Sequence, residues 1–193
     1  MNGHSEADMP TTAPVITAYR VHATELGQGA PVPPSNMFAP ESDALRTAIE
    51  DVFSERRPGG KPERRSAIFV FESQEAALTF ALSKSRARLY RVLVRDSDIL
   101  HRADWEWLVE AHKLPDEPAR WADFADSYWA GKMSPVPVIE LMVREARVET
   151  EITISHQQRL EYRERRYGLQ IPPPAGQAPL TTGRPFNDGT DTE

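Results

Sequence analysis

The stretch AIFVFESQEAALTFALSKSRARLYRVLV, residues 67–94, contains two strand patterns separated by a helix pattern. It opens with a continuous apolar run over residues 67–71, which has the length of a buried strand. Ser73 follows at the position of a helix N-cap, and the helix is predicted over residues 75–84 with apolar side chains facing inward. Residues 89–94 alternate between two sets of side chains, as a strand does. The stretch therefore predicts strands and helices packed around one core.

The chain on either side of this stretch continues the succession of strands and helices. Residues 15–24 are rich in β-branched and aromatic side chains, which are typical of a strand. Periodicity predicts helices over residues 41–53, 104–112, 120–129 and 157–167, and strands over residues 136–143 and 147–154. The turn at residues 145–146 is consistent with a hairpin of the last two strands, or with one long kinked strand. Because the strands show no regular βαβ spacing, we predict an α+β fold with a mixed or antiparallel sheet and flanking helices.

Length and composition limit the class of protein. A chain of 193 residues is long enough for one domain with a proper core, which we place at residues 15–170. Polar, Pro-rich and Gly-rich composition predicts disorder for residues 1–14 and 171–193, and poor order for residues 27–40. The absence of cysteine removes disulfide frameworks, thiolate zinc sites and cysteine nucleophiles.

Charge and hydropathy limit the partners. The formal net charge of -6 argues against a general nucleic-acid coat, because such proteins usually carry a basic excess. No apolar run approaches the length of about 18 residues that a membrane span needs, and the N-terminus lacks the apolar region of a secretory signal. We therefore expect a cytoplasmic protein without a membrane partner.

The first of three short motifs is the strand segment YRVHAT, residues 19–24. Strand alternation puts three of its side chains on one face, namely Arg20, His22 and Thr24. One cleft can therefore be lined by all three.

The second and third motifs follow in the middle and late parts of the chain. The second is the strand segment IFVFES, residues 68–73, followed by the helix segment AALTF, which ends at Phe80. The third is VIELMV, residues 138–143, in which Glu140 is the one carboxylate of an apolar run. A charge buried there without a partner costs several kcal/mol, so Glu140 needs either a partner or a purpose.

Together the three motifs resemble the ADP-ribosyltransferase superfamily, and within it the branch with a His, aromatic, Glu triad. This branch includes the catalytic domain of poly(ADP-ribose) polymerases and related bacterial mono-ADP-ribosyltransferases. The resemblance covers residues 19–154 and implies a split mixed or antiparallel sheet with NAD bound in its cleft as a substrate. It implies two catalytic residues: His22, which would bond a ribose hydroxyl on the adenosine side, and Glu140, which would bond the 2′-hydroxyl of the nicotinamide ribose and offset the cationic transition state.

The resemblance also implies a set of NAD-binding side chains. Phe80 would stack on the nicotinamide ring, and Phe69 is a candidate for the other face of that ring. Thr24 matches the small hydroxyl residue that follows the family's histidine by two positions. Arg20 would bind the pyrophosphate through two parallel hydrogen bonds. The sequence leaves two candidates, Arg20 and His22, for the residue that contacts the dinucleotide.

The sequence departs from the family pattern in several places. His22 is followed by Ala23 where the family commonly has glycine, and Phe80 keeps the ring of the usual tyrosine without its hydroxyl. Val138 stands two residues before Glu140, where the arginine-modifying branch has a Gln or Glu that activates its acceptor. The Ser-Thr-Ser strand of that branch is also absent, so arginine modification is disfavoured. The departures at Ala23 and Phe80 leave open a non-catalytic protein on the same fold.

Each of these residues also has a purely structural explanation. His22 could be a satisfied polar side chain on a strand, and Phe80 could be a core residue of its helix. Glu140 could belong to an edge strand and pair with Arg144 or Arg147.

Other groups of polar side chains give weaker signals. His101, Asp104 and His112 match no common spacing of metal ligands, so we predict no metal site. Two basic clusters are expected to be solvated faces, or to hold a phosphate backbone if they border one cleft. Their members are Arg56, Arg57, Lys61, Arg64 and Arg65, and later Arg159, Arg163, Arg165 and Arg166.

The leading hypothesis is an NAD-dependent mono-ADP-ribosyltransferase that modifies an unknown protein or nucleic-acid acceptor and releases nicotinamide. Water as the acceptor would make it an NAD glycohydrolase. A toxin or anti-phage role is a natural setting for a small transferase, and a neutralising or regulatory protein would then be a further partner. The alternatives are a non-catalytic module on the same fold that binds a nucleotide or a protein, and a small nucleic-acid binder.

Overall fold

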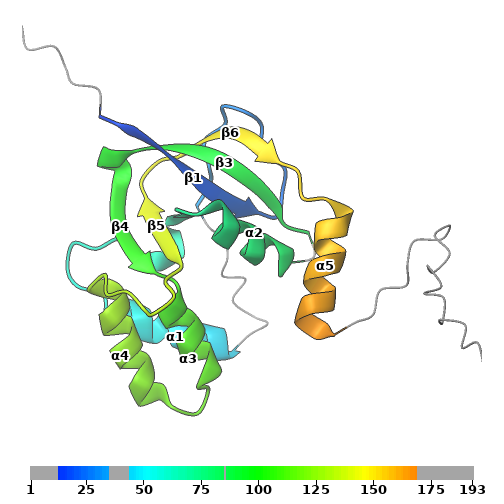
Figure 1. The fold of residues 1–193 in the computed structure, drawn as a ribbon. Coiled ribbons are helices and arrows are strands. Elements are labelled where there is room, and N and C mark those ends of the chain that lie inside the picture. Colours follow the sequence, from blue (N-terminus) through cyan, green and yellow to red (C-terminus); the bar gives the residue numbers. More distant parts are fainter. Residues whose placement is uncertain (1–12, 35–43, 85, 169–193) are drawn as a thin grey trace, which may run out of the picture. The chain divides into compact units, whose positions relative to one another are not determined.

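The computed structural model describes residues 13–34, 44–84 and 86–168 of the chain (Figure 1). The chain divides into two compact units, one that ends at Ser155 and one that begins at His156. Of the stretches predicted to be disordered or poorly ordered, residues 1–12, 35–40 and 171–193 lie outside the described part.

The first unit is α+β with an antiparallel sheet, as the sequence predicts. Its described residues form six strands in the order β4-β5-β2-β1-β3-β6, and every neighbouring pair is antiparallel. The strands are β1 (Val15–His22), β2 (Ile68–Phe71), β3 (Arg88–Arg95), β4 (Ile99–Asp104), β5 (Ile139–Val143) and β6 (Arg147–Ile152). The helices of this unit are α1 (Ala44–Glu55), α2 (Gln74–Leu82), α3 (Glu106–Lys113) and α4 (Pro118–Trp129), with the 3-10 turns η1 (Arg64–Ser66) and η2 (Asp96–Asp98).

The second unit contains α5 (His156–Tyr167), whose side chains all retain contact with solvent. None of the helices in the described ranges of the chain is long and apolar enough to cross a lipid bilayer.

The sheet is joined weakly in its middle, at the junction of β1 and β2. β1 pairs with β3 over its whole length, but it pairs with β2 only at Tyr19 and Phe71. Beyond that point the carbonyl of Phe69 accepts a hydrogen bond from the Arg20 side chain instead, with 2.7 Å between Nη1 and the oxygen. The sheet therefore consists of two well-paired halves, β4-β5-β2 and β1-β3-β6, that meet at one pairing.

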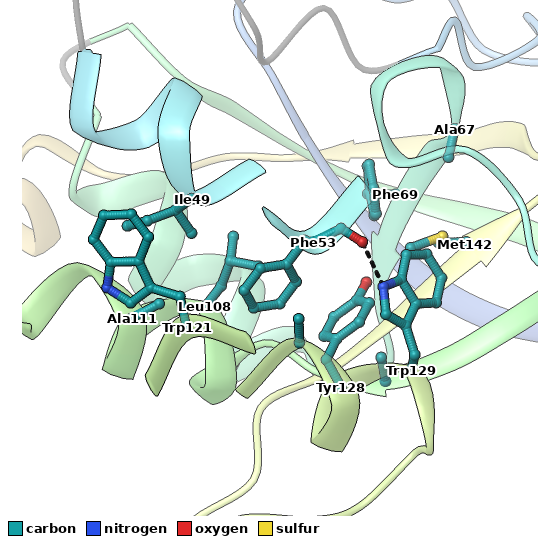
Figure 2. Packing of buried hydrophobic residues seen from close by; sticks show 12 residues of the cluster. Ile49, Phe53, Ala67, Phe69, Leu108, Ala111, Trp121, Tyr128, Trp129 and Met142 are labelled. Carbon is teal, nitrogen blue, oxygen red and sulfur yellow. Dashed lines mark hydrogen bonds between the residues drawn. The ribbon is translucent and has the colours of Figure 1, made fainter. Parts of the chain in front are cut away.

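Three helices cover one face of the first half-sheet. In Figure 1, α1, α3 and α4 gather on one side of β4 and β5. Their apolar side chains pack on Phe69 of β2 and Met142 of β5. Figure 2 shows Tyr128 between Phe53 and Trp129, and the Trp129 indole donates a hydrogen bond of 2.7 Å to the Phe53 carbonyl. This packing is the aromatic core against which the polar side chains of the site lie.

The opposite face is covered by the sheet itself. Its core contains side chains of both half-sheets and of the loop before α1: Ala18, Val32, Ile68, Val70, Tyr90, Val92, Val94, Leu141, Val143, Ala146 and Val148. No described helix contributes to this cluster, so the sheet curls over its own face. The strong twist that sheets of this size adopt makes such curling possible.

α2 lies over the β1–β2 junction. Its N-cap is Ser73, whose hydroxyl accepts a hydrogen bond of 3.4 Å from the backbone N–H of Ala76, as predicted. Ala77 packs with Phe71 of β2 and Leu89 of β3, and Phe80 lies at the edge of this cluster. The small alanines let the helix approach both half-sheets.

Two sequence predictions about the sheet are wrong. β5 and β6 form neither a hairpin nor one kinked strand, because β5 pairs with β2 and β4 while β6 pairs with β3. The short turn between them passes from one half-sheet to the other, which the curl of the sheet brings close together. The sequence analysis also missed β4, which pairs with β5 at the edge of the sheet.

Residues 27–34 are better ordered than their composition predicts. Gly29 donates a backbone hydrogen bond of 2.8 Å to Val148, and Val32 donates one of 2.9 Å to Ala146. Gly29 has a φ of +76°, which favours glycine. Backbone bonds to the edge of β6, together with the burial of Val32, hold this part of the loop.

Candidate functional site

Glu140 lies in the middle of the first half-sheet, on β5 between β2 and β4. Its side chain is 2% exposed, and its Oε1 accepts hydrogen bonds from Arg64 Nη1, at 2.7 Å, and from the Tyr128 hydroxyl. An edge-strand pairing with Arg144 or Arg147 is therefore wrong. Arg144 contacts Asp98 at 3.5 Å, and Arg147 donates to the Gly29 carbonyl at 3.4 Å.

Arg64 is a partner of Glu140 that local sequence patterns do not reveal. It belongs to a basic cluster expected to be solvated, but η1 carries it into the core, where it is 1% exposed. Its Nε lies 3.0 Å from Glu50 Oε2 on α1, and its guanidinium carbon lies 4.8 Å from the centre of the Phe69 ring and 4.7 Å from that of Tyr128. Two carboxylates from different elements thus share one guanidinium.

Two members of the buried network, Arg64 and Tyr128, have a raised pKa. Burial alone would lower the pKa of Arg64, but Tyr128, Glu140 and Glu50 around it raise the pKa well above its ordinary value. Burial also raises the pKa of the Tyr128 hydroxyl well above its ordinary value. Arg64 is therefore a permanent cation, and the tyrosine is a permanent O–H donor.

Four of the predicted site residues line one small cavity. They are Arg20 of β1, Phe69 of β2, Phe80 of α2 and Glu140 of β5. The cavity has a volume of about 10 Å³ and lies where the β1–β2 junction opens. A volume of that size holds about one water molecule.

One oxygen of the Glu140 carboxylate carries no hydrogen bond from the described residues. Oε1 carries both hydrogen bonds of the side chain, and no hydrogen bond among the described residues uses Oε2. Burial lowers the pKa of Arg20 to about 10, so its guanidinium stays charged at neutral pH. The residues that line the cavity therefore include a carboxylate with one unbonded oxygen, a cation and aromatic rings.

Phe80 belongs to a group of three aromatic rings beside the cavity. The centre of its ring lies 5.5 Å from that of Phe71 and 5.6 Å from that of Trp105. The Trp105 contact is edge-to-face, a favourable geometry for aromatic pairs. The side chain of Phe80 is half-buried, so it packs on Phe71 and Trp105 and is also partly exposed to solvent.

His22 and Thr24 are not among the residues that line this cavity. They bond to each other instead, with 3.0 Å between His22 Nδ1 and the Thr24 hydroxyl oxygen. The prediction that Arg20 shares a cleft with both residues is therefore not met in this structure. Arg20 reaches across the β1–β2 junction to the Phe69 carbonyl, while His22 stays half-buried at the end of its strand.

A second recess, of about 380 Å³, lies along β4 and the C-terminal end of α4. His101 stacks on Trp129 in its wall, with the ring centres 5.2 Å apart. Its Nδ1 lies 3.2 Å from Lys61 Nζ and its Nε2 lies 3.3 Å from the Tyr128 carbonyl, so Nε2 donates and Nδ1 accepts. Burial, then Lys61 and Arg64, lower the pKa of His101 to about 4. The imidazole is therefore neutral at physiological pH.

The low pKa of His101 predicts a dependence of stability on pH. Its folded-state pKa of about 4 lies below the ordinary value of 6.5, so the unfolded chain takes up the proton first as the pH falls. We expect this group to reduce the free energy of unfolding by about 2 kcal/mol between pH 6.5 and pH 4. Denaturant titrations of the wild type and of His101→Gln should diverge over this range. Parallel loss of stability in the two proteins would contradict the assignment.

Asp104 and His112, which the sequence analysis considered together with His101, have separate structural roles. Asp104 accepts backbone hydrogen bonds from Glu106, Ser134 and Val138. His112 Nδ1 lies 2.7 Å from the Leu108 carbonyl, within α3. The described residues contain no group of three or more His, Asp or Glu side chains placed to hold a metal ion.

Comparison with known proteins adds no assignment: no protein-family model matches the chain, and no curated protein matches its sequence.

Proposed function

We propose that this chain is an NAD-dependent mono-ADP-ribosyltransferase, which transfers ADP-ribose to a macromolecular acceptor and releases nicotinamide. The observation that carries the proposal is the cavity shared by Glu140, Arg20, Phe69 and Phe80. These residues come from β5, β1, β2 and α2, and each belongs to one of the three motifs that resemble this superfamily. The weakly joined sheet also supports the proposal, since the resemblance implies a split sheet with NAD at the cleft.

The chemistry of the cavity fits the cleavage of a nicotinamide–ribose bond. This bond breaks with oxocarbenium character, so a negative charge beside the ribose lowers the barrier. Glu140 Oε2 would accept a hydrogen bond from the ribose 2′-hydroxyl and offset the developing positive charge. Phe80 and Phe69 would pack on the nicotinamide ring, a contact worth about 0.5–1.5 kcal/mol beyond its buried area.

We assign the contact with the pyrophosphate to Arg20 rather than His22. Arg20 lines the cavity with Glu140, whereas His22 bonds Thr24. A guanidinium also offers a bidentate set of donors to phosphate oxygens. His22 and Thr24 remain proposed contacts of the adenosine-side ribose.

Binding requires the cavity to enlarge, because about 10 Å³ does not hold a nicotinamide ring. Phe80 is the wall that can yield, since it is half-buried and sits on α2 over the β1–β2 junction. The proposal therefore includes a movement of Phe80 on binding.

The second candidate is a non-catalytic binding module on the same fold. The burial of Glu140 favours it, since a carboxylate that is 2% exposed and paired with Arg64 already has a structural role. Glu140 would then stabilise the fold and contact no substrate.

The test is nicotinamide release from NAD by the full chain. NAD is incubated with the protein alone, with mixed cellular protein and with nucleic acid, and nicotinamide is measured by chromatography. We expect release by the wild type and a loss of about 10²–10³-fold in the rate for Glu140→Gln, because one electrostatic contact to the transition state is removed. Glu72→Gln, an exposed carboxylate paired with Arg102, is the matched control and should keep the wild-type rate.

Two results would count against the enzyme. No release under any of the acceptor conditions, together with no rise of melting temperature on addition of NAD, would favour the binding module. Equal release by the wild type and by a folded Glu140→Gln would remove Glu140 from the chemistry.

A further inference from the structure

We infer that Tyr128 and Arg64 are positioning residues that hold the Glu140 carboxylate with one oxygen turned toward the cavity. The inference rests on the proposed function, since it concerns the residue that would stabilise the transition state. Neither side chain lines the cavity with Glu140, so both would act through the carboxylate.

The hydrogen bonds of the Glu140 carboxylate are distributed unequally between its two oxygens. Both hydrogen bonds go to Oε1, one from Arg64 and one from Tyr128, while Oε2 accepts none from the described residues. Two donors on one oxygen fix the rotation of the carboxylate as well as its position. A free glutamate side chain would have several rotamers of similar energy.

Tyr128 is held rigidly by the aromatic core. Its ring is fully buried and packs edge-to-face on three neighbours, with 5.5 Å between its centre and that of Phe53, 5.2 Å to Trp129 and 5.6 Å to His101. The hydroxyl accepts from Arg64 Nη1 and donates to Glu140. Because the Tyr128 hydroxyl keeps its proton, the direction of this short chain of hydrogen bonds is fixed.

Arg64 is anchored by Glu50 of α1. Its Nε and Nη2 face the two oxygens of Glu50 on α1, at 3.0 and 3.4 Å. Its Nη1 is then the donor that reaches Glu140 and Tyr128. Lysine cannot supply this fork, because its ammonium group is one compact charge without a planar set of donors. The Glu140 carboxylate on β5 is thus held in place relative to α1 and α4.

The kinetic consequence separates positioning from a merely structural role. Glu140 stabilises charge that develops during bond cleavage, so misplacing it weakens the transition state more than the bound substrate. Tyr128→Phe should therefore lower kcat and leave KM for NAD unchanged. A change that only loosened the fold would reduce the amount of active protein and the melting temperature without this split.

The experiment measures kcat and KM for nicotinamide release by the wild type and by Tyr128→Phe. The variant removes one hydroxyl and keeps the ring in the aromatic core. We expect kcat to fall by about 10–100-fold, the usual effect of removing a partner that orients a functional side chain. Trp121→Phe is the control: it lies on the same helix and loses the hydrogen bond to the Leu114 carbonyl, and it should keep the wild-type kcat.

Arg64 gives a second series, in which Arg64→Lys keeps the charge and Arg64→Met removes it. We expect kcat in the order wild type, lysine, methionine; Tyr128→Phe decides the matter if the methionine variant does not fold. An active wild type with unchanged kcat in Tyr128→Phe overturns the inference alone, as does a rise of KM at constant kcat. An inactive wild type overturns the proposed function and this inference together.

Discussion

Replacement of Arg64 by methionine is expected to lower the free energy of unfolding by about 3–5 kcal/mol. Methionine keeps the apolar stem but ends about where Nε stands, so the loss combines the missing cation with the space that the guanidinium leaves between Phe69 and Tyr128. Glu50 and Glu140 are each at most 2% exposed and would remain in the core without a cation. Removing one partner from a buried ion pair leaves the other charge without hydration and without a counter-charge. Denaturant titration followed by tryptophan fluorescence measures the change.

The neighbouring residue provides the matched control. Arg65 stands next to Arg64 and pairs with Asp51, but both members of this pair are about half exposed. Arg65→Met should therefore cost less than about 1 kcal/mol, because exposed ion pairs contribute little. Equal losses in the two variants would show that the buried network does not carry the stability ascribed to it.

Asp104→Ala is expected to cost about 4 kcal/mol of unfolding free energy. The carboxylate is fully buried, and its Oδ1 accepts from the backbone N–H groups of Glu106, at 3.0 Å, and Val138, at 2.9 Å. Its Oδ2 accepts from the N–H of Ser134 at 2.7 Å. Hydrogen bonds to a charged group contribute about 1.5–3 kcal/mol each, and three partly buried N–H donors would lose their acceptor at once, with solvent replacing part of what is lost.

Asp104→Asn distinguishes the loss of these acceptors from a general loss of packing. The asparagine oxygen can keep two of the amides, whereas its NH₂ group would face the N–H of Ser134, donor against donor. We expect the free energy of unfolding of Asp104→Asn to lie between that of the wild type and that of Asp104→Ala. Asparagine and alanine variants of equal stability would contradict this account of the site.

The elements nearest the opening motif were the most predictable part of the chain. The apolar run at residues 67–71, the cap at Ser73 and the helix after it depend on local spacing, and the structure confirms them. β4 was missed because it mixes charged with apolar side chains, and only its pairing with β5 makes it a strand. Local patterns therefore identified strands that lie inside the sheet better than this edge strand.

The candidate site was predictable in part. Glu140 is recognisable as a carboxylate in an apolar run, and the structure shows that it has a partner, Arg64. The partner was not predictable, since Arg64 and Arg65 have the same local composition and only one is buried. What selects Arg64 is Glu50, 14 residues away, and Glu140, 76 residues away. Strand alternation likewise could not show that Arg20 would reach across the β1–β2 junction.

The contact between Tyr19 and Phe71 determines how this sheet can deform. A continuous ladder resists separation because many hydrogen bonds must break together, but β1 and β2 meet at a single point. The angle between the two half-sheets is therefore held by side chains, namely the Arg20–Phe69 hydrogen bond at the junction and the apolar core that Ala18 and Val92 share with Val70 and Leu141. Changes to these contacts, rather than the loss of a ladder, would loosen the joint between the two halves.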